Sequence, residues 1–375
     1  MSAPETSSQT LSAAVIGCGR MGVFTSTNMR AYSPAFWFPL AHAEAFAEAE
    51  GVDLTALCDP SQEALLHAGE HYGVTRRHTD HGAMLAGGAP DLAGIATRTL
   101  GRAAIIEDCI TAGTRALHIE KPLCNSPEEL DRLEPLLSRQ DVFATLGALR
   151  RHLAPYREVM ARARSGMFGA LRAAYCEFGE SPLFWTHPHA VDLILMAAGG
   201  ARVEAVEARL GPVTREGARV INDPAVLSAD IWFEGGFSGH ITRLPGTDFR
   251  LACENGQFAV LNNGHQLWQK GRKADERAAS GNPAGADPYP QPTLIDLPDT
   301  GGPRGALPAI GQLVAALRGD PKARSENAAI KRDIITGQRI LFAIVQSHLE
   351  GGAPVAPDAI DPDMFIEART GALPA

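Results

Sequence analysis

An apolar run that ends in glycines, VIGCGRMG at residues 15–22, constrains the fold of this chain more than any other stretch. Gly17, Gly19 and Gly22 form the pattern G-x-G-x-x-G. After a strand, such glycines allow a tight turn and let the backbone approach a pyrophosphate at the start of the next helix. The second apolar run ends in Asp59, which can bind ribose hydroxyls and repel a 2′-phosphate. The pattern predicts a dinucleotide site for NAD, with NADP less favoured; the alternative is a glycine-rich turn without a ligand.

The spacing of this motif is unusual. Asp59 lies 37 residues after Gly22, whereas the motif expects about 20. The excess falls in a segment that contains Pro34 and Pro39, and a single helix cannot run through those prolines. We therefore expect the first helix to be broken by an insertion near residues 24–40.

The insertion carries the closely spaced aromatic residues Tyr32, Phe36, Trp37 and Phe38. So many apolar rings are not left in water without a reason. One interpretation is that they pack on the body of the protein or on a neighbouring subunit. The other is that they form a wall of the substrate pocket, opposite Trp185, in which case Trp37 binds the substrate.

The chain divides into two regions of different pattern. Helical stretches separate apolar runs at 12–17, 52–59, 91–97, 115–120 and 142–150. This alternation predicts a parallel sheet covered on both sides. We assign residues 11–147 to this Rossmann domain.

Shorter alternating runs with Gly and Asn-Gly turns follow, which favour a mostly antiparallel sheet. We assign residues 148–375 to a second domain. Helical patterns near 304–319 and 325–350 close the chain and can pack back on the first domain. Residues 271–291 are polar and rich in Gly and Pro, which predicts a long loop.

Composition narrows the class of protein. The 375 residues carry a net charge of −9, which argues against non-specific nucleic-acid binding and against a polybasic membrane surface. No apolar run is long enough to cross a bilayer, and residues 1–10 read as a disordered tail without the features of a secretion signal. The six cysteines form no C-x-x-C pair. A reducing cytoplasm fits this pattern.

A lysine before proline ends the fourth apolar run. In LHIEKPLCNS, Glu120, Lys121 and Pro122 stand at the carboxyl edge of the predicted sheet, where ligands of open parallel sheets bind. Lys121 is therefore expected where a nicotinamide would lie. A surface salt bridge between Glu120 and Lys121 is the alternative, but neighbours at a strand end point to opposite sides.

These motifs together resemble the Gfo/Idh/MocA oxidoreductases, named for glucose–fructose oxidoreductase and inositol dehydrogenase. The matching stretches are AAVIGCGRMG, ALCDP, DLAGIATRT, ITAGTRALHIEKPL, RSGMFGALR, HAVDLILMAAGG and RILFAIVQSHLEGGAPV. The resemblance implies an α/β fold, with an N-terminal Rossmann domain and a C-terminal domain built on an open, mostly antiparallel sheet. It also implies NAD(P)-dependent chemistry on sugars or cyclitols, and a homodimer or homotetramer formed through the open sheet face.

The resemblance also implies the catalytic pair. Lys121 matches the lysine that hydrogen-bonds the reacting oxygen, and His189 matches the catalytic base. The chain departs from the usual family pattern at Arg102, where a histidine is common, and at Trp185, where many members have aspartate.

The stretch WTHPHAVDLI places His187, His189 and Asp192 close together. Such a group could hold a metal, but no H-E-x-x-H and no second Cys or His cluster accompanies it, and we expect no metal. Imidazole suits a base that accepts an alcohol proton near neutral pH. Asp192 could orient His189, and Trp185 offers an apolar face for a sugar ring.

Arg150 and Arg151 follow the last strand of the first domain. One of them could bind a carboxylate or phosphate of the substrate, or both could form interdomain salt bridges. The expected substrate contacts are Lys121, Arg151, Trp185, His187, His189, Asp192 and Trp37. The expected cofactor contacts are Gly17, Gly19, Arg20, Met21, Gly22, Asp59, Thr97, Arg98, Arg102 and Glu120.

The sequence thus predicts an NAD(H)-dependent dehydrogenase or reductase. It would transfer a hydride between nicotinamide and a secondary alcohol or ketone of a sugar, cyclitol or sugar derivative. A redox-cycling NAD-dependent glycosidase on the same fold is one alternative. A non-enzymatic, ligand-sensing regulator is another, although a sensor has no need of both Lys121 and His189. No nucleic-acid or membrane partner is expected.

Overall fold

The computed structural model describes residues 10–33, 35–273, 290–296 and 304–369. The predicted tail, apart from residue 10, and most of the predicted loop at 271–291 lie outside the described residues. None of the described helices has the length and apolar character needed to cross a membrane.

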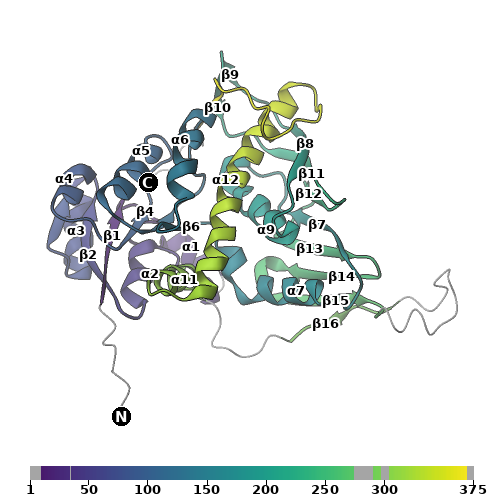
Figure 1. The fold of residues 1–375 in the computed structure, drawn as a ribbon, viewed down its shortest axis with the longest axis horizontal. Coiled ribbons are helices and arrows are strands. Elements are labelled where there is room, and N and C mark those ends of the chain that lie inside the picture. The colour runs from purple at the N-terminus through teal and green to yellow at the C-terminus, as the bar shows by residue number, and fades with distance from the viewer. Residues whose placement is uncertain (1–9, 34, 274–289, 297–303, 370–375) are drawn as a thin grey trace, which may run out of the picture.

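A six-stranded parallel sheet forms the first layer of the molecule (Figure 1). Its strands are β1 (Leu11–Ile16), β2 (Val52–Cys58), β3 (Arg76–His78), β4 (Leu92–Ile95), β5 (Ala116–Ile119) and β6 (Phe143–Leu146). The order β3-β2-β1-β4-β5-β6 is that of a Rossmann fold. The sequence pattern does not predict β3, because its three residues contain no apolar run. The order reverses between β1 and β4, which is the place where such sheets bind ligands.

Helices connect these strands as predicted. They are α2 (His42–Glu48), α3 (Gln62–Tyr72), α4 (His81–Ala86), α5 (Arg102–Ala112) and α6 (Pro127–Leu137). Before α2, the predicted insertion contains the short helices α1 (Thr27–Tyr32) and η1 (Ala35–Trp37).

The insertion interrupts a helix that then resumes. After the glycine loop the chain makes a single turn, in which the N–H of Val23 donates to the carbonyl of Gly19 at 3.0 Å. In a continuous helix, residues 25 and 26 would next donate to Met21 and Gly22. Here His42 and Ala43 donate to those carbonyls, at 2.9 and 2.8 Å. The 17 residues 25–41 are therefore looped out, and without them Asp59 would lie 20 residues after Gly22, as the motif expects.

The second region is built on an eight-stranded sheet of order β16-β15-β14-β13-β7-β12-β11-β8. Its neighbours are antiparallel except for β7 and β12, which run parallel. The strands are β7 (Leu171–Glu177), β8 (Val203–Leu210), β11 (Val226–Phe233), β12 (Ser238–Thr242), β13 (Asp248–Cys253), β14 (Gly256–Leu261), β15 (Gln266–Gly271) and β16 (Thr293–Leu294). The predicted fold class, a Rossmann domain followed by an α/β domain with a mostly antiparallel sheet, is confirmed.

Shorter elements complete this region. A small sheet joins β9 (Arg215–Glu216), β10 (Arg219–Asn222) and β17 (Phe365–Arg369). The helices are η2 (Leu149–His152), α7 (Ala154–Arg164), α8 (Leu183–Thr186), α9 (Pro188–Ala198), η3 (Asn262–Gly264), α11 (Leu307–Leu317) and α12 (Pro321–Leu349).

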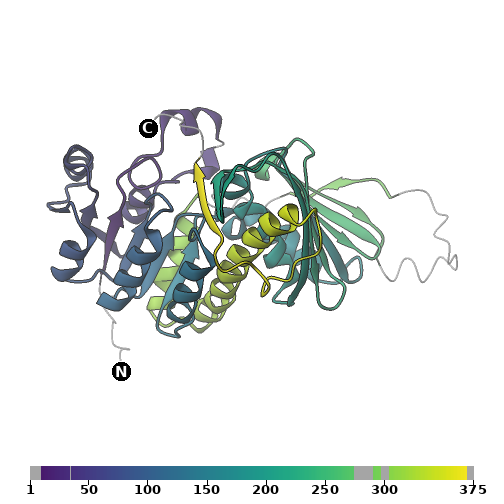
Figure 2. The same ribbon diagram turned by 90° about the horizontal axis from the view of Figure 1, so that it is seen from above.

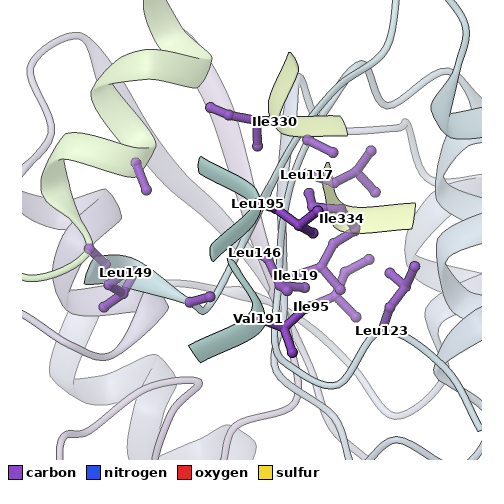
Figure 3. Packing of buried hydrophobic residues seen from close by; sticks show 14 of the residues in the cluster. Ile95, Leu117, Ile119, Leu123, Leu146, Leu149, Val191, Leu195, Ile330 and Ile334 are labelled. Carbon is purple, nitrogen blue, oxygen red and sulfur yellow. The ribbon is translucent and has the colours of Figure 1, made fainter. Parts of the chain in front are cut away.

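The long helix α12 runs between the two sheets (Figure 2). It contacts β6 of the parallel sheet, β8 of the mixed sheet, and α9. Figure 3 shows the buried side chains that meet there, from β4, β5 and β6, from η2 and α9, and from α12. This shared core holds the first turn of α9, which carries His189, near the segments that follow β5 and β6.

Candidate active site

The glycine loop has the geometry of a pyrophosphate cradle. Gly17 has a φ of +99°, and a Cβ there would lie 2.7 Å from the carbonyl carbon of Ala96. A Cβ on Gly22 would lie 1.7 Å from the Gly17 oxygen. By contrast, a Cβ on Gly19 would meet nothing within 4 Å. Two glycines therefore close the turn, and the third leaves its backbone open on the outer side, which fits the approach of a dinucleotide.

Asp59 lies beside this loop. Its Oδ2 accepts the backbone N–H of Cys18 at 2.7 Å, and its Oδ1 accepts that of Ser61 at 2.8 Å. Each carboxylate oxygen can still accept a further hydrogen bond. The side chain is only partly buried. The structure thus fixes a negative charge next to the cradle, where ribose hydroxyls could donate to it.

Four further residues that were expected to contact the cofactor differ in exposure. Arg20 and Arg98 are exposed, and Met21 is partly buried. The hydroxyl of Thr97 is buried, with no hydrogen-bond partner among the described residues. A bound ligand could supply that partner.

Arg102 and Glu120 are placed differently from the sequence expectation. The guanidinium of Arg102 is buried and donates to the carbonyls of Glu120, at 2.7 Å, of Pro122 and of Thr97. It therefore ties the loop after β4 to the segment after β5. Glu120 is also buried, and its carboxylate faces Nε2 of His42 at 3.3 Å. Burial alone would raise the pKa of Glu120, but the hydrogen bond and charge of His42 lower it to about 2.

Lys121 projects from the segment after β5. Its Nζ donates to the carbonyl of Trp185 and lies 4.1 Å from the centre of the Trp185 ring. Burial lowers the pKa of Lys121 to about 8, against the raising effect of Glu120 and Asp223. The ammonium is thus held at a site where it is less stable than in water, and a developing negative charge there would be stabilised strongly.

His189 lies in the first turn of α9, and its Nδ1 is buried with no hydrogen-bond partner among the described residues. Burial, followed by the charges of Arg150 and Lys121, lowers the pKa of His189 well below 6.5. The imidazole is therefore neutral at pH 7 and can accept a proton. Lys121 donates to the carbonyl of Trp185, four residues before His189, so the structure brings the two predicted residues near each other.

His187 was expected to contact the substrate, but its side chain lies inside the protein. It is fully buried, its Nε2 lies 3.1 Å from Oγ of Ser181, and its ring stacks on Phe178. Burial lowers the pKa of His187 to about 4. Among the described residues, no group of three or more His, Cys, Asp or Glu side chains could hold a metal ion.

Asp192 and Arg151 also depart from their expected roles. Asp192 does not orient His189: its carboxylate binds Nε of Arg151 at 2.8 Å. The same guanidinium binds Asp333 of α12 at 3.0 Å, and all three side chains are buried. Arg151 is therefore satisfied within the protein and is not available for a substrate. Arg150 and Arg151 were expected either to bind a substrate anion or to form salt bridges within the protein. Arg151 forms salt bridges.

Trp185 is half exposed, and the chain around it is fixed by a residue that sequence reasoning missed. The carboxylate of Asp223 accepts the backbone N–H groups of Phe184 at 2.8 Å and of Trp185 at 3.0 Å. Burial raises the pKa of Asp223 to about 6. Asp223 lies in a turn before β11, far from Trp185 in sequence, and no local motif marks it.

Trp37 lies inside the protein and does not form an open wall. Its ring is 6% exposed, and its Nε1 donates to the carbonyl of Asn263 at 3.3 Å. The guanidinium of Arg150 lies over this ring, 5.3 Å from its centre. The inserted segment thus packs on the body of the protein, which was the first of the two interpretations. Phe38 is partly buried, and the side chains of Tyr32 and Phe36 lie outside what the structure describes.

The fold and these contacts define a two-domain protein with a Rossmann dinucleotide site next to a Lys–His pair. Residues 11–148 match the family model GFO_IDH_MocA, described as "Oxidoreductase family, NAD-binding Rossmann fold". The resemblance seen in the sequence motifs is confirmed. It identifies this region as an NAD-binding Rossmann domain of the Gfo/Idh/MocA oxidoreductases.

Known proteins resemble the chain to different extents. A D-apiose dehydrogenase from Paraburkholderia graminis is 31% identical over 122 residues, which cover 32% of this chain and 28% of that relative. An oxidoreductase from Agrobacterium radiobacter, solved with NAD⁺, L-tartaric acid and magnesium, has a TM-score of 0.67 at 19% identity, over 94% of this chain and 99% of that one. The WlbA dehydrogenase from Bordetella pertussis, solved with NADH and UDP-GlcNAcA, has a TM-score of 0.64 at 20% identity, over 93% and 98%. The structural similarities establish the two-domain fold.

Proposed function

We propose that this chain is an NAD(H)-dependent oxidoreductase that interconverts a secondary alcohol and a ketone on a sugar, cyclitol or sugar derivative. The observation that carries the proposal is a neutral His189, whose Nδ1 has no hydrogen-bond partner among the described residues, together with the Lys121 ammonium, which donates to the carbonyl of Trp185, four residues before His189. Lys121 follows the carboxyl end of β5, and α9, which carries His189, contacts η2 just after β6. The D-apiose dehydrogenase relative is named for a sugar, which supports the substrate class.

His189, Lys121 and Trp185 have different roles in the proposed alcohol oxidation. When bound, NAD⁺ supplies a hydride acceptor at C4 of the nicotinamide. His189 accepts the hydroxyl proton, and the Lys121 ammonium stabilises the negative charge that develops on that oxygen. The carbon then loses its hydrogen as hydride, and the C–O bond becomes a carbonyl. Trp185 offers its half-exposed ring as an apolar surface for the substrate.

We assign cofactor binding to the open side of the glycine loop at Gly19, to Arg20 and Met21, to Asp59, and to Thr97 and Arg98. The Asp59 carboxylate favours NAD over NADP, because a 2′-phosphate would meet a negative charge. A small-molecule substrate, a homo-oligomeric assembly and a cytoplasmic location stay predictions.

The test is a screen of sugars, cyclitols and sugar acids with NAD⁺, followed by NADH absorbance. With the best substrate, Lys121→Ala and His189→Ala should each lower kcat by about 10²-fold, the effect of losing an acid–base or charge-stabilising group. The affinity for NAD should change little in calorimetry. Lys322→Ala and His81→Ala, at positions outside the site, are the matched controls.

Other results would contradict the proposal. Release of an aglycone from glycosides without net NADH would indicate the redox-cycling glycosidase. If His189→Ala keeps full activity, the role given to that residue is wrong. A ligand response that neither substitution changes would indicate a regulator.

A further inference from the structure

Arg150 is held from three sides in a fixed position. Its guanidinium carbon lies 5.3 Å from the ring centre of Trp37 and 5.0 Å from that of Phe178. Its Nε donates to Oδ1 of Asn263 at 3.1 Å. These three partners come from the insertion, from the end of β7 and from the turn after β14. Such a long side chain loses much rotamer freedom in this arrangement, so its orientation is determined before any ligand arrives.

The charge of Arg150 has no counter-charge in the part of the chain that the structure describes. The adjacent Arg151 binds two carboxylates, and the terminal nitrogens of Arg102 donate to three carbonyls. Arg150 forms no ion pair with any described carboxylate. Besides the two rings and Asn263, its guanidinium interacts with the Tyr156 hydroxyl: burial raises the pKa of Tyr156, and the charge and hydrogen bond of Arg150 oppose that rise. A partly buried cation without a counter-charge is costly unless an anion can pair with it.

Arg150 also lies near the proposed catalytic pair. The short helix η2, which carries Arg150, contacts α9, which carries His189, and the Phe178 ring beneath the guanidinium stacks on His187. In keeping with this geometry, the charge of Arg150 is, after burial, the largest cause that lowers the pKa of His189. A substrate hydroxyl placed between Lys121 and His189 leaves another part of the same small molecule within reach of Arg150.

We propose that Arg150 binds a carboxylate of the substrate, so that the substrate is a polyhydroxy acid and not a neutral sugar. Asn263 engages Nε, and the guanidinium also interacts with the Tyr156 hydroxyl. The remaining N–H groups of the terminal nitrogens are the ones that can donate to a carboxylate. Aromatic rings lie over the guanidinium, so a ligand approaches along its edge, in its plane. A carboxylate can present both of its oxygens in that plane, and a phosphate is the alternative anion that the experiment tests. The assignment rests on the proposed function, since it names the substrate class of the same site.

The experiment compares pairs of compounds that differ in one carboxylate. D-Glucuronate is paired with D-glucose, D-galacturonate with D-galactose, and D-gluconate with D-glucitol; D-glucose 6-phosphate tests a phosphate. We measure kcat/KM with saturating NAD⁺ and the Kd of each compound for the enzyme–NADH complex. At least one acid should exceed its neutral partner in kcat/KM and affinity by roughly 30-fold or more, the range for a charge-assisted bidentate pair.

Substitutions of Arg150 test whether this residue causes the preference for the acid. Arg150→Gln should lower kcat/KM for the preferred acid by about 30- to 100-fold and leave the neutral partner within about threefold. For the preferred acid, kcat/KM of Arg150→Lys should lie between those of the wild type and Arg150→Gln, because an ammonium keeps the charge without the planar fork. Arg150→Lys is also the replacement test if Arg150→Gln folds poorly. Arg172→Gln removes an exposed arginine on β7 and is the matched control. NAD affinity should be the same in all variants.

Several outcomes would overturn the inference. Acids and neutral partners used equally well, or equal losses for both in Arg150→Gln, would show that Arg150 does not select a carboxylate, while the dehydrogenase proposal stands. A preference for the 6-phosphate over every acid would reject the carboxylate, as would the absence of binding by any acid. Acids that bind through Arg150 without forming NADH would support the inference and contradict the proposed function.

Discussion

Near this site, residues of the same type that are close in sequence differ in the partners of their side chains. His187 is buried with a Ser181 partner, whereas Nδ1 of His189 has no hydrogen-bond partner within the described part of the chain. Arg151 is enclosed by carboxylates, whereas Arg150 lies between aromatic rings. Arg150 and Arg151 belong to a 3₁₀ turn, in which successive side chains point about 120° apart. A single step along the chain therefore separates a structural residue from one that can meet a ligand.

At the residue scale, the two catalytic groups predict the pH dependence of alcohol oxidation. The pKa of His189 is depressed well below 6.5, so the imidazole stays neutral as the pH falls to 6.5. The pKa of Lys121 is lowered to about 8, so the ammonium is lost as the pH rises through that value. We expect kcat/KM to be flat between these limits and to fall above pH 8 by up to about tenfold per unit.

Lys121→Arg provides the check, because a guanidinium stays charged. In that variant the alkaline fall should move up by more than about one pH unit, whatever the loss in absolute rate. His81→Ala should leave the profile unchanged. If kcat/KM of Lys121→Arg falls at the same alkaline pH as that of the wild type, a group other than Lys121 titrates there.

At the element scale, the insertion acts as a brace between the two regions of the chain. It leaves and re-enters the helix after the glycine loop without disturbing its hydrogen bonds. At its tip, Trp37 donates to Asn263 and supports Arg150. The carbonyl of Pro39 accepts the N–H of Ala306, just before α11. The Rossmann loop is thus joined to the turn that positions Arg150.

Trp37→Ala tests this brace. Removing a buried tryptophan should cost about 3 kcal/mol of unfolding free energy. It should also raise the KM of the substrate about tenfold, because Arg150 loses one of its ring contacts, with the Kd for NAD unchanged. Trp37→Phe keeps an aromatic face and should stay within about threefold of the wild-type KM.

Trp232→Ala, at an exposed ring on β11, is the control. Normal substrate binding by Trp37→Ala, together with a changed assembly state in light scattering, would instead make the insertion an oligomer contact.

At the scale of the whole molecule, α12 joins both sheets into one core, and a buried ion triad crosses it. Arg151 of η2 binds Asp192 of α9 and Asp333 of α12. Burial raises the pKa of Asp192 to about 6 even with Arg151 beside it. The triad thus fixes the helix that carries His189 to the helix shared by both regions.

Arg151→Met should lower the free energy of unfolding by about 3 kcal/mol at pH 7.5, because it leaves a buried carboxylate without its counter-charge. The loss should shrink as the pH falls toward 5.5, since Asp192 can then be protonated in the folded state and is no longer a buried charge. Urea unfolding at the two pH values measures this. Turnover by the folded variant should stay within about threefold of wild type.

The comparison variant is Arg172→Met, whose partner Glu254 is exposed. An equal deficit at both pH values would show that lost packing, and not the carboxylate charge, destabilises Arg151→Met.

The sequence by itself determined the features that depend on local order. The glycine spacing, the apolar runs and the prolines predicted the Rossmann domain, the interrupted helix and the mostly antiparallel second sheet, because periodicity and backbone geometry act over a few residues. The placement of Lys121 at a strand end followed from the same order. The family resemblance added His189, which no local pattern distinguishes from His187.

Only the tertiary structure decided which polar side chains stay free for a ligand. Arg150 meets Asn263 across 113 residues, Arg151 meets Asp333 across 182, and the N–H of Trp185 meets Asp223 across 38. Trp37 finds its acceptor 226 residues away. Whether a buried charge is neutralised depends on partners that folding brings from distant segments, and no local pattern specifies them. That is why the sequence could name two arginines as anion binders, while the fold enclosed one and left the other without a carboxylate partner among the described residues.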